Sequence, residues 1–323
     1  MAEYKKYHPV DSSEVSRFCG IRSFMRLPQL QATEGVDFGI LGLPVDTGST
    51  FRTGSRFAPA AIREMSMMLR AASVNLDIDI FKYVSGVDYG DVNVSPCDLQ
   101  KAHKAIELGL RPIVEAGVVP VCFGGDHSVT LPELRAVAAT HGPVALVHLD
   151  AHLDTYDIEN GDTLTHGTPF KIAVDEGLID TAHSIQVGVR GIFSTDAIPV
   201  SRDMGFEVIP AGELREEGLD RVGARINKRV GSRKAFLTFD IDFVDPAYAP
   251  GTGTIEVGGV TSFEALYLLR QTKDLDYVAC DVVEVLPAFD PTQITAYMAG
   301  CVAHEFIAMM AYRKRKAASG HSS

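Results

Sequence analysis

Long hydrophobic runs and paired cysteines are both missing from this sequence. No run reaches the ~18 apolar residues that a membrane-spanning helix needs, and the first residues lack the apolar core of a secretory signal. The cysteines are odd in number, scattered and without a CxxC pair: Cys19, Cys97, Cys122, Cys280 and Cys301. These absences exclude a disulfide framework and predict a cytoplasmic protein with reduced, mostly buried thiols and no membrane partner.

Positive charge is also scarce, because 30 Lys and Arg residues face 42 Asp and Glu residues and leave a net charge of −12. Such a chain has no overall attraction for nucleic-acid phosphates or anionic lipid, so no nucleic-acid partner is expected. A small cationic substrate would suit it better. The 46% of hydrophobic residues against 22% of charged ones indicates a folded chain rather than a disordered one.

Apolar runs that suit buried strands alternate along the chain with helical patterns. Strands are predicted at 36–43, 118–123, 144–149, 184–188, 207–209, 235–239 and 277–283. Helices are predicted at 59–69, 98–116, 131–139, 169–176, 219–230, 262–272 and 292–313. The alternation predicts an α/β fold, a three-layer α/β/α sandwich around a mostly parallel sheet. No long linker interrupts it, so residues 1–323 are expected to form one domain, with a polar extension at 1–17 and a frayed basic tail at 313–323.

Three short stretches stand out, each directly after or at the end of a predicted strand. They are FGGDHS at 123–128, HLDAHLD at 148–154 and FDIDFVD at 239–245. In an extended chain side chains alternate, so Asp150, His152 and Asp154 would project to one side. Asp240 and Asp242 would do the same. Because clefts in open parallel sheets form where strands end, these residues predict a cluster of carboxylates and imidazoles in a cleft.

Buried carboxylates in such numbers need counter-charge. Four aspartates supply −4, which two divalent cations would balance, whereas one cation would leave −2: Asp150, Asp154, Asp240 and Asp242. Imidazole and carboxylate without thiolate favour Mn, Zn, Ni or Fe. Two ions that share carboxylates can also hold one bridging water and lower its pKa.

The three stretches resemble the metal-binding signatures of the ureohydrolase family, which contains arginase, agmatinase and the guanidino-acid amidinohydrolases. The resemblance runs from about Pro9 to Ala311. It includes RFCG at 17–20, FMRLP at 24–28, TGSRFAP at 53–59 and APGTGT at 249–254. It implies the family's arginase-like three-layer fold, and the chain is most similar to the agmatinase branch.

The resemblance also implies a metal centre with two Mn²⁺ ions per subunit, and the ligand set would accept Ni²⁺ or Co²⁺. One ion would be bound by His127, Asp150, Asp154 and Asp240. The other would be bound by Asp150, His152, Asp240 and Asp242. Asp150 and Asp240 would therefore bridge the two ions.

The reaction so implied is hydrolysis of a guanidino group to urea and an amine. His166, within THGTPF, matches the family's proton-shuttling histidine, which would protonate the leaving amine. Glu284, within DVVEV, matches the carboxylate that pairs with the guanidinium and sets its orientation. Asp242 would help the metal ions to stabilise the tetrahedral intermediate.

Other polar residues near these stretches are expected to have structural roles. His148 is expected to support the metal ligands from behind rather than to act as a seventh ligand. Asp126 and Asp245 are expected to be supporting or turn residues. Histidines without acidic neighbours in their sequence pattern, and cysteines within apolar strands, are assigned to the fold: His103, His183, His304, Cys122 and Cys280.

The substrate is predicted from a loop. Arginases carry an Asn/Ser-rich loop before the shuttle histidine, and residues 155–164 lack that pattern, so arginine is not expected. The agmatinase-like branch predicts agmatine, cleaved to putrescine, and Asp157, Glu159 and Asp162 would suit its distal ammonium. Guanidinobutyrate and guanidinopropionate are the alternative substrates. Departures from the family pattern that bear on this choice are Ile255, Leu286 and Phe289.

Two other classes of protein stay open from the sequence. A non-catalytic metal-bound regulatory subunit would keep the fold without turnover, although intact ligands together with His166 and Glu284 argue against it. A metal amide hydrolase such as a deacetylase would use a single ion and would lack some of the aspartates. Because the ureohydrolase family forms trimers and hexamers, a homo-oligomer of this kind is expected.

Overall fold

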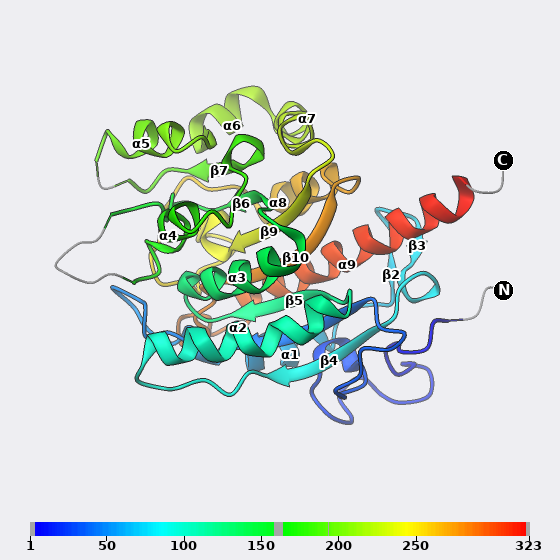
Figure 1. The fold of residues 1–323 in the computed structure, drawn as a ribbon. Helices are drawn as coiled ribbons and strands as arrows, with labels where there is room; N and C mark the ends of the chain where they lie inside the picture. Colours follow the sequence, from blue (N-terminus) through cyan, green and yellow to red (C-terminus); the bar gives the residue numbers. More distant parts are fainter. Residues whose placement is uncertain (1–3, 158–163, 193, 321–323) are drawn as a thin grey trace.

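A sheet of eight parallel strands forms the centre of the computed structural model, which describes residues 4–157, 164–192 and 194–320 (Figure 1). The strand order is β4-β1-β5-β10-β9-β6-β7-β8. Its strands are β1 (Phe38–Leu43), β4 (Gly86–Asp91), β5 (Val119–Gly124), β6 (Ala145–Leu149), β7 (Ile185–Val189), β8 (Glu207–Pro210), β9 (Lys234–Asp240) and β10 (Asp276–Val283). All the predicted strands are present, each within two residues of its predicted ends.

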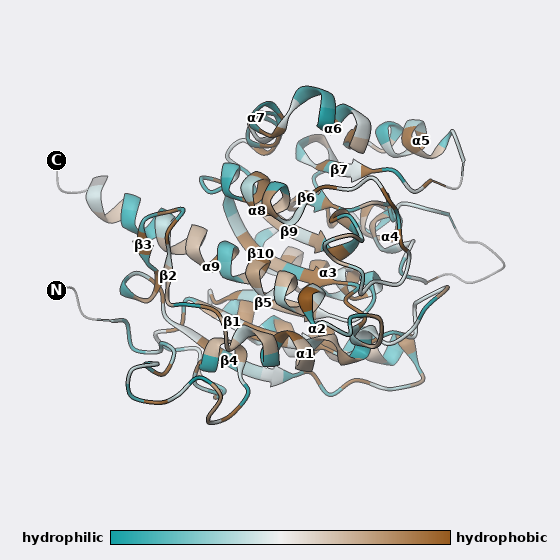
Figure 2. Cartoon of the chain, turned by 180° about the vertical axis from the view of Figure 1, so that it is seen from behind, coloured by the Kyte–Doolittle hydropathy of each residue, from teal (hydrophilic) through white to brown (hydrophobic). Residues whose placement is uncertain are grey.

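Helices cover both faces of the sheet, which confirms the predicted three-layer α/β/α sandwich (Figure 1). One face is covered by α2 (Leu99–Glu115), α3 (Thr130–His141) and α4 (Pro169–Asp175). The other is covered by α1 (Ala58–Ser66), α7 (Leu219–Val230), α8 (Ser262–Gln271) and α9 (Ile294–Gly320). The strands are buried on both faces, which explains why their sequences read as continuous apolar runs. The outer helices α6 (Ala211–Glu217) and α7 are largely hydrophilic (Figure 2).

Local signals in the sequence explain where several helices begin. Asp98 precedes α2 and accepts a hydrogen bond from the Lys101 N–H at 3.0 Å. Thr261 and Glu264 form a reciprocal capping box at the start of α8. These bonds satisfy backbone N–H groups that have no partner inside the helix.

Some elements were not predicted because their sequences are short or polar. They are the antiparallel pair β2 (Ala72–Ser73) and β3 (Ile78–Asp79), the edge strand β4, and the helices α5 (Ala197–Asp203) and α6. In β4 the sequence GVDYGD has two glycines and two aspartates, which are depleted in strands. Asp88 is nevertheless buried there, because the Arg63 guanidinium of α1 pairs with its carboxylate at 2.8 Å.

The predicted frayed tail is wrong for residues 313–320, because α9 continues to Gly320. Its basic side chains are engaged: Arg313 binds Asp276 at 2.8 Å and Lys316 binds Asp274 at 2.7 Å. By length and composition α9 is apolar enough to cross a membrane, but 78% of its most apolar window is buried inside the fold. Such burial is typical of a core helix.

The cysteines are free, and their burial differs in part from the prediction. Cys122 and Cys280 are buried within β5 and β10 as expected. Cys19 and Cys97 are exposed, so the expectation of mostly buried thiols is wrong for these two.

The four central strands bring distant parts of the chain to one edge of the sheet. In spatial order they are β5, β10, β9 and β6, and all run parallel. Their carboxyl ends therefore lie side by side, which is where ligand clefts form in such sheets. The three polar stretches of the sequence follow β5, β6 and β9 at this edge.

Replacement of Arg63 by Met is expected to destabilise the fold, because it leaves the Asp88 carboxylate buried without its counter-charge. The free energy of unfolding should fall by about 3–5 kcal/mol, measured by urea denaturation. Arg22→Met is the matched control, because Arg22 pairs with Glu64 of the same helix while both side chains are exposed. That variant should lose less than ~1 kcal/mol. Equal losses in the two variants would contradict the buried pairing.

Candidate functional site

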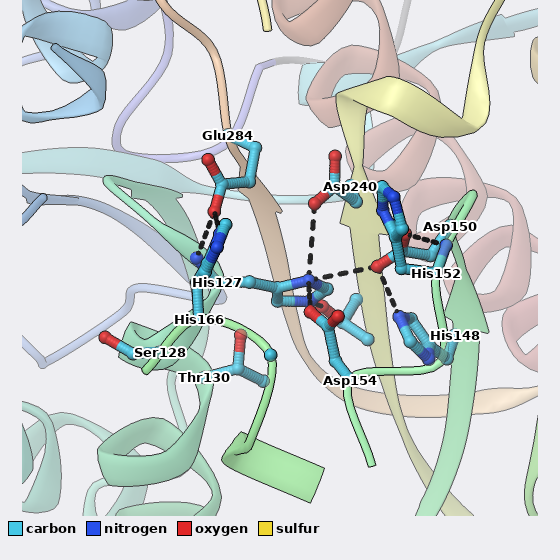
Figure 3. Close-up of polar contacts among 12 residues, drawn as sticks. His127, Ser128, Thr130, His148, Asp150, His152, Asp154, His166, Asp240 and Glu284 are labelled. Carbon is cyan, nitrogen blue, oxygen red and sulfur yellow. Dashed lines mark hydrogen bonds and ion pairs between the residues drawn. The ribbon is translucent and has the colours of Figure 1, made fainter. Parts of the chain in front are cut away.

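Side chains that follow the four central strands converge on one cluster (Figure 3). Asp240 is the last residue of β9, Asp150 follows β6 and Glu284 follows β10. His127 opens the 3-10 turn His127–Val129 after β5. All of these side chains are buried, so the cluster lies inside the protein at the carboxyl edge of the sheet.

The predicted convergence is observed, but the predicted reason for it is wrong. β6 ends at Leu149 and β9 ends at Asp240, so the aspartates beyond them do not alternate along an extended strand. After β9, Asp240 accepts the Asp242 N–H at 2.8 Å and turns the chain into the 3-10 helix Ile241–Phe243. After β6, Asp154 adopts a φ of 49°, a left-handed conformation that is rare outside glycine. Local turns therefore aim these carboxylates at the cluster.

His127 faces three carboxylates through one ring nitrogen. Its Nδ1 lies 3.1 Å from Asp150 Oδ2, 2.9 Å from Asp154 Oδ2 and 3.3 Å from Asp240 Oδ2. Despite these distances, the directions do not fit a hydrogen bond, and among the described residues Nδ1 has no hydrogen-bond partner. A buried nitrogen surrounded by carboxylate oxygens in this way is suited to ligate a cation together with them.

His152 makes a second group with Asp150 and Asp242. Its Nδ1 lies 3.0 Å from Asp242 Oδ2 and 3.4 Å from Asp150 Oδ1. The Ala151 N–H binds Asp242 Oδ1 at 3.0 Å, which fixes that carboxylate. Asp150 thus belongs to both groups, and the six predicted ligands lie together: His127, Asp150, His152, Asp154, Asp240 and Asp242.

The electrostatics of the cluster fit divalent cations. Burial together with the Asp242 and Asp150 carboxylates raises the pKa of Asp240 well above its usual range. Burial and Asp150 also raise the pKa of Asp242. Burial would lower the pKa of His127, but its three carboxylate neighbours outweigh burial and raise it well above the ordinary value. These shifts reflect the repulsion between buried carboxylates, which divalent ions bound among them would offset.

Glu284 lies beside this cluster and holds several groups with one carboxylate (Figure 3). Its Oε1 accepts the His127 N–H at 2.9 Å and lies 2.9 Å from His166 Nδ1. Its Oε2 is buried and has no hydrogen-bond partner among the described residues. The residue has a φ of 62°, so backbone strain is accepted at the position where this carboxylate is presented.

His166 is held between Glu284 and a threonine that the sequence did not single out. Its Nε2 lies 2.8 Å from Thr50 Oγ1. The backbone N–H of His166 donates to the Gly48 carbonyl at 2.9 Å. Burial lowers the pKa of His166, but the Glu284 carboxylate outweighs it and raises the pKa to about 9. The imidazole is therefore protonated at neutral pH.

Asp126 and Gly125 hold the loop that carries Thr50. Asp126 Oδ2 accepts the Gly48 N–H at 2.7 Å. A Cβ on Gly125 would lie 1.5 Å from the Val45 carbonyl oxygen, so that only glycine fits there. The supporting role expected for Asp126 thus has a geometric basis. No short-range pattern could have revealed Thr50, because it lies 116 residues from His166 in the sequence.

The remaining expectations have mixed outcomes. His148 Nε2 lies 2.7 Å from Asp150 Oδ2, behind that carboxylate. Asp245 accepts backbone N–H groups of Ala247, Gly258 and Gly259, as a turn residue does.

Among the histidines assigned to the fold, His304 binds the Arg70 carbonyl and His103 binds Ser128. His183 does have an acidic neighbour, Asp180, at 2.9 Å. Asp157 is exposed, while Glu159 and Asp162 lie outside the described residues.

Comparisons with known proteins agree with this geometry. A sequence model described as the arginase family matches residues 36–309. A mitochondrial agmatinase of Gallus gallus is 40% identical over 303 residues, which cover 94% of this chain and 89% of that protein. A mitochondrial guanidino acid hydrolase of Homo sapiens is 40% identical over 300 residues, 93% of this chain and 85% of that protein. The solved structure of proclavaminate amidinohydrolase from Streptomyces clavuligerus superposes with a TM-score of 0.89 at 40% identity, covering 92% of this chain and 99% of that one.

Replacement of Asp150 or Asp240 by Asn is expected to abolish metal binding or activity, because Asp150 belongs to both groups of ligands and Asp240 lies 3.3 Å from His127 while its Oδ1 accepts the Asp242 N–H. The bound metal can be counted by atomic absorption after loading with Mn²⁺ and desalting. Asp245→Asn is the matched control, since Asp245 lies in the same stretch but only caps a turn. Near-wild-type metal content and turnover in both ligand variants would rule out the bridging positions.

Proposed function

The chain belongs to the arginase family, and from that premise we propose that it hydrolyses agmatine to urea and putrescine at a dinuclear manganese centre. Enzymes of this family hydrolyse C–N bonds of guanidino groups at binuclear metal centres, and this chain has His and Asp groups of the kind that hold such ions. The observation that carries the proposal is the buried Glu284 carboxylate beside the six clustered His and Asp side chains. It offers a charged acceptor for a guanidinium next to a metal-binding cluster.

The residues would divide between the two proposed ions as the resemblance to the family implies, with His127 and His152 in separate groups. His127 and Asp154 would hold one ion, His152 and Asp242 would hold the other, and Asp150 and Asp240 would bridge them. When bound, two such ions lower the pKa of a shared water and so supply a nucleophile near neutral pH.

Glu284 would bind the substrate guanidinium through Oε2. Paired charge-assisted hydrogen bonds to a carboxylate orient the planar group and place its carbon toward the metal cluster. Because Oε1 is already engaged by the His127 backbone, the carboxylate is fixed before substrate arrives. This preorganisation lowers the entropy lost on reaching the reactive geometry.

His166 would deliver a proton to the leaving amine. It is protonated at neutral pH, and its contact with Glu284 places it next to the guanidinium site. An amine leaves as the neutral species only after gaining a proton, which a positioned imidazolium can provide. Thr50, on the other side of the ring, would keep His166 in that orientation.

Charges around the site bear on which guanidine is preferred. Glu256 lies 3.8 Å from His152 Nε2 and is partly exposed, so it would suit the distal ammonium of agmatine. Arg52 favours the second candidate, a guanidino acid. A Cβ on Gly253 would lie 3.4 Å from the Arg52 carbonyl oxygen and 3.5 Å from Glu284 Oε2, and the Arg52 guanidinium lies 4.7 Å from the Phe289 ring centroid.

Two of the departures from the family pattern therefore lie near this region. Leu286 is buried, and its Cδ1 lies 3.8 Å from the point where a Cβ on Gly253 would be. The Phe289 ring is stacked against the Arg52 guanidinium. Ile255 is exposed. The Arg52 backbone lies near Glu284, and an Arg side chain at this position would suit a carboxylate substrate better than agmatine.

We also propose a cytoplasmic homo-oligomer, a trimer or a hexamer, as the working form. The reduced cysteines support the compartment. The resemblance to a family of trimers and hexamers supports the assembly, and light scattering of the purified protein would measure it.

A substrate panel tests the function. Urea release from agmatine, 4-guanidinobutyrate, 3-guanidinopropionate, arginine and free guanidine should be scored by kcat/KM after loading with Mn²⁺. Agmatine is expected to rank first and arginine to be poor. Glu284→Gln removes the charge that is proposed to bind the guanidinium. It should keep its metal but lose turnover with every guanidine, which would tie turnover to this carboxylate. Higher kcat/KM for a guanidino acid, reduced by Arg52→Met, would replace agmatine with the second candidate. No urea from any guanidine at full metal content would favour a non-catalytic regulator.

The pH dependence of turnover tests the role of His166. Because the raised pKa means that the proton is held up to about pH 9, kcat should fall as the pH rises through that value. His166→Ala should leave the metal content intact, lower kcat by about 10²- to 10⁴-fold and remove this alkaline limb. His183→Ala, at a histidine remote from the cluster, serves as the control. An unchanged rate in His166→Ala would show that another group carries the proton.

A further inference from the structure

The chain leaves β7 through the sequence GVRG at 188–191, which lies against one side of the metal-binding cluster. Because β7 pairs with β6, this segment continues the carboxyl edge of the sheet beyond the four central strands. It offers no carboxylate, imidazole or thiolate of its own to a cation. Its contacts instead reach the residues around His152 and Asp242.

Backbone hydrogen bonds join this segment to the turn that carries His152. The N–H groups of Arg190 and Gly191 both donate to the Ala151 carbonyl, at 2.8 and 2.9 Å. The N–H of the same Ala151 donates to Asp242 Oδ1 at 3.0 Å. Through Ala151, the segment therefore bears on the backbone next to His152 and on the Asp242 carboxylate together.

Glycines at both ends allow the segment to approach this closely. A Cβ on Gly191 would lie 2.7 Å from Cδ2 and Nε2 of the His152 ring. A Cβ on Gly188 would lie 2.4 Å from the Phe243 ring and 2.9 Å from the Asp150 carbonyl oxygen, and Gly188 has a φ of 105°. The close contact with the cluster therefore requires residues without side chains at these two positions.

The Arg190 guanidinium binds backbone carbonyl oxygens of three separate segments. Its Nη2 donates to the Asp242 carbonyl at 2.5 Å, and its Nε and Nη2 donate to the Glu256 carbonyl at 3.3 and 2.9 Å. Its Nη1 donates to the carbonyls of Gly188 and Phe243 at 3.2 and 3.4 Å. The planar fork of five N–H donors in arginine suits such an arrangement, which a single ammonium group could not reproduce.

Two carboxylates that face the His152 ring are positioned through this one arginine. Asp242, whose Oδ2 lies 3.0 Å from His152 Nδ1, is held at its carboxylate by Ala151 and at its carbonyl by Arg190. Glu256, whose Oε1 lies 3.8 Å from His152 Nε2, is held at its carbonyl by the same guanidinium. Both sides of the imidazole thus depend on Arg190.

We propose that Arg190 is a positioning residue for one half of the metal centre, the half formed by His152 and Asp242. The inference rests on the proposed metal centre and deepens it, because Arg190 would touch neither ion nor substrate. His127, in the other half, has a different support, since its N–H donates to Glu284 at 2.9 Å. Loss of the Arg190 side chain is therefore expected to act on one ion of the two.

Arg190→Met is the main variant, because it removes the five donors and keeps much of the side-chain volume. Titration of the metal-free protein with Mn²⁺, followed by calorimetry and by the electron paramagnetic resonance signal of free Mn²⁺, gives the affinity of each site. His127→Ala and His152→Ala show which step of the titration belongs to which half. In Arg190→Met the His152 half is expected to bind its ion about 10- to 100-fold more weakly, as is usual when a residue that orients metal ligands is lost. The His127 half should keep its affinity.

Arg229→Met is the matched control, since Arg229 is also a partly buried arginine that binds backbone carbonyls of three residues. It donates to Ser184 and Thr181 at 3.1 and 3.0 Å and to Gly205, at the opposite end of β7 from the cluster. It should retain both affinities. Equal weakening in the two methionine variants, or a uniform loss at both halves, would mean that Arg190 serves only the fold and would overturn the inference. Unchanged affinity in Arg190→Met would overturn it as well.

Arg190→Lys provides a second test should Arg190→Met not fold. The ammonium keeps the charge but cannot bind the carbonyls of three segments at once, so the same ion should still bind more weakly than in the wild-type protein. Wild-type affinity in this variant would contradict positioning through the guanidinium. Failure of the proposed function is distinguishable, because in that case the wild-type protein itself would bind no Mn²⁺ pair or release no urea.

Discussion

The concentration of negative charge at the carboxyl edge of the sheet is the constraint on which this structure depends. Asp150, Asp154, Asp240 and Asp242 are buried within reach of one another, where a low dielectric makes their repulsion strong. Imidazoles and backbone N–H groups surround the carboxylates and offset part of this repulsion. One of them is the Ala151 N–H, which donates to Asp242. Divalent cations bound among these side chains would complete the charge balance.

Strands and turns have separate tasks around this cluster. The four central strands bring their ends together, and this is a property of the parallel sheet. The turns that follow set the direction of each side chain. At Asp154 and Glu284 this requires a left-handed backbone conformation. Such strain persists only where the surrounding structure over-determines it. Here the residues lie directly after strands that are buried on both faces, which supplies that constraint.

Sequence patterns predicted the layers and the contiguous polar stretches because both depend on residues close together in the chain. They failed where the reason for a residue lies far away. The edge strand β4 reads as polar until Arg63 is seen to pair with Asp88. Thr50 and Thr238 look ordinary because the histidines that they touch are 116 and 111 residues distant. The tail was misjudged since its basic residues find acidic partners outside α9.

The contact between the His127 N–H and Glu284 joins residues 157 positions apart. Since each of the four strands contributes part of the centre, a chain that has formed only some of the sheet has no complete place for the ions. Metal uptake at the proposed centre would thereby be restricted to molecules that have finished folding. Ions that bind only this state would favour it in proportion to their free concentration, so the supply of metal in the cell would set how durable the enzyme is as well as how active.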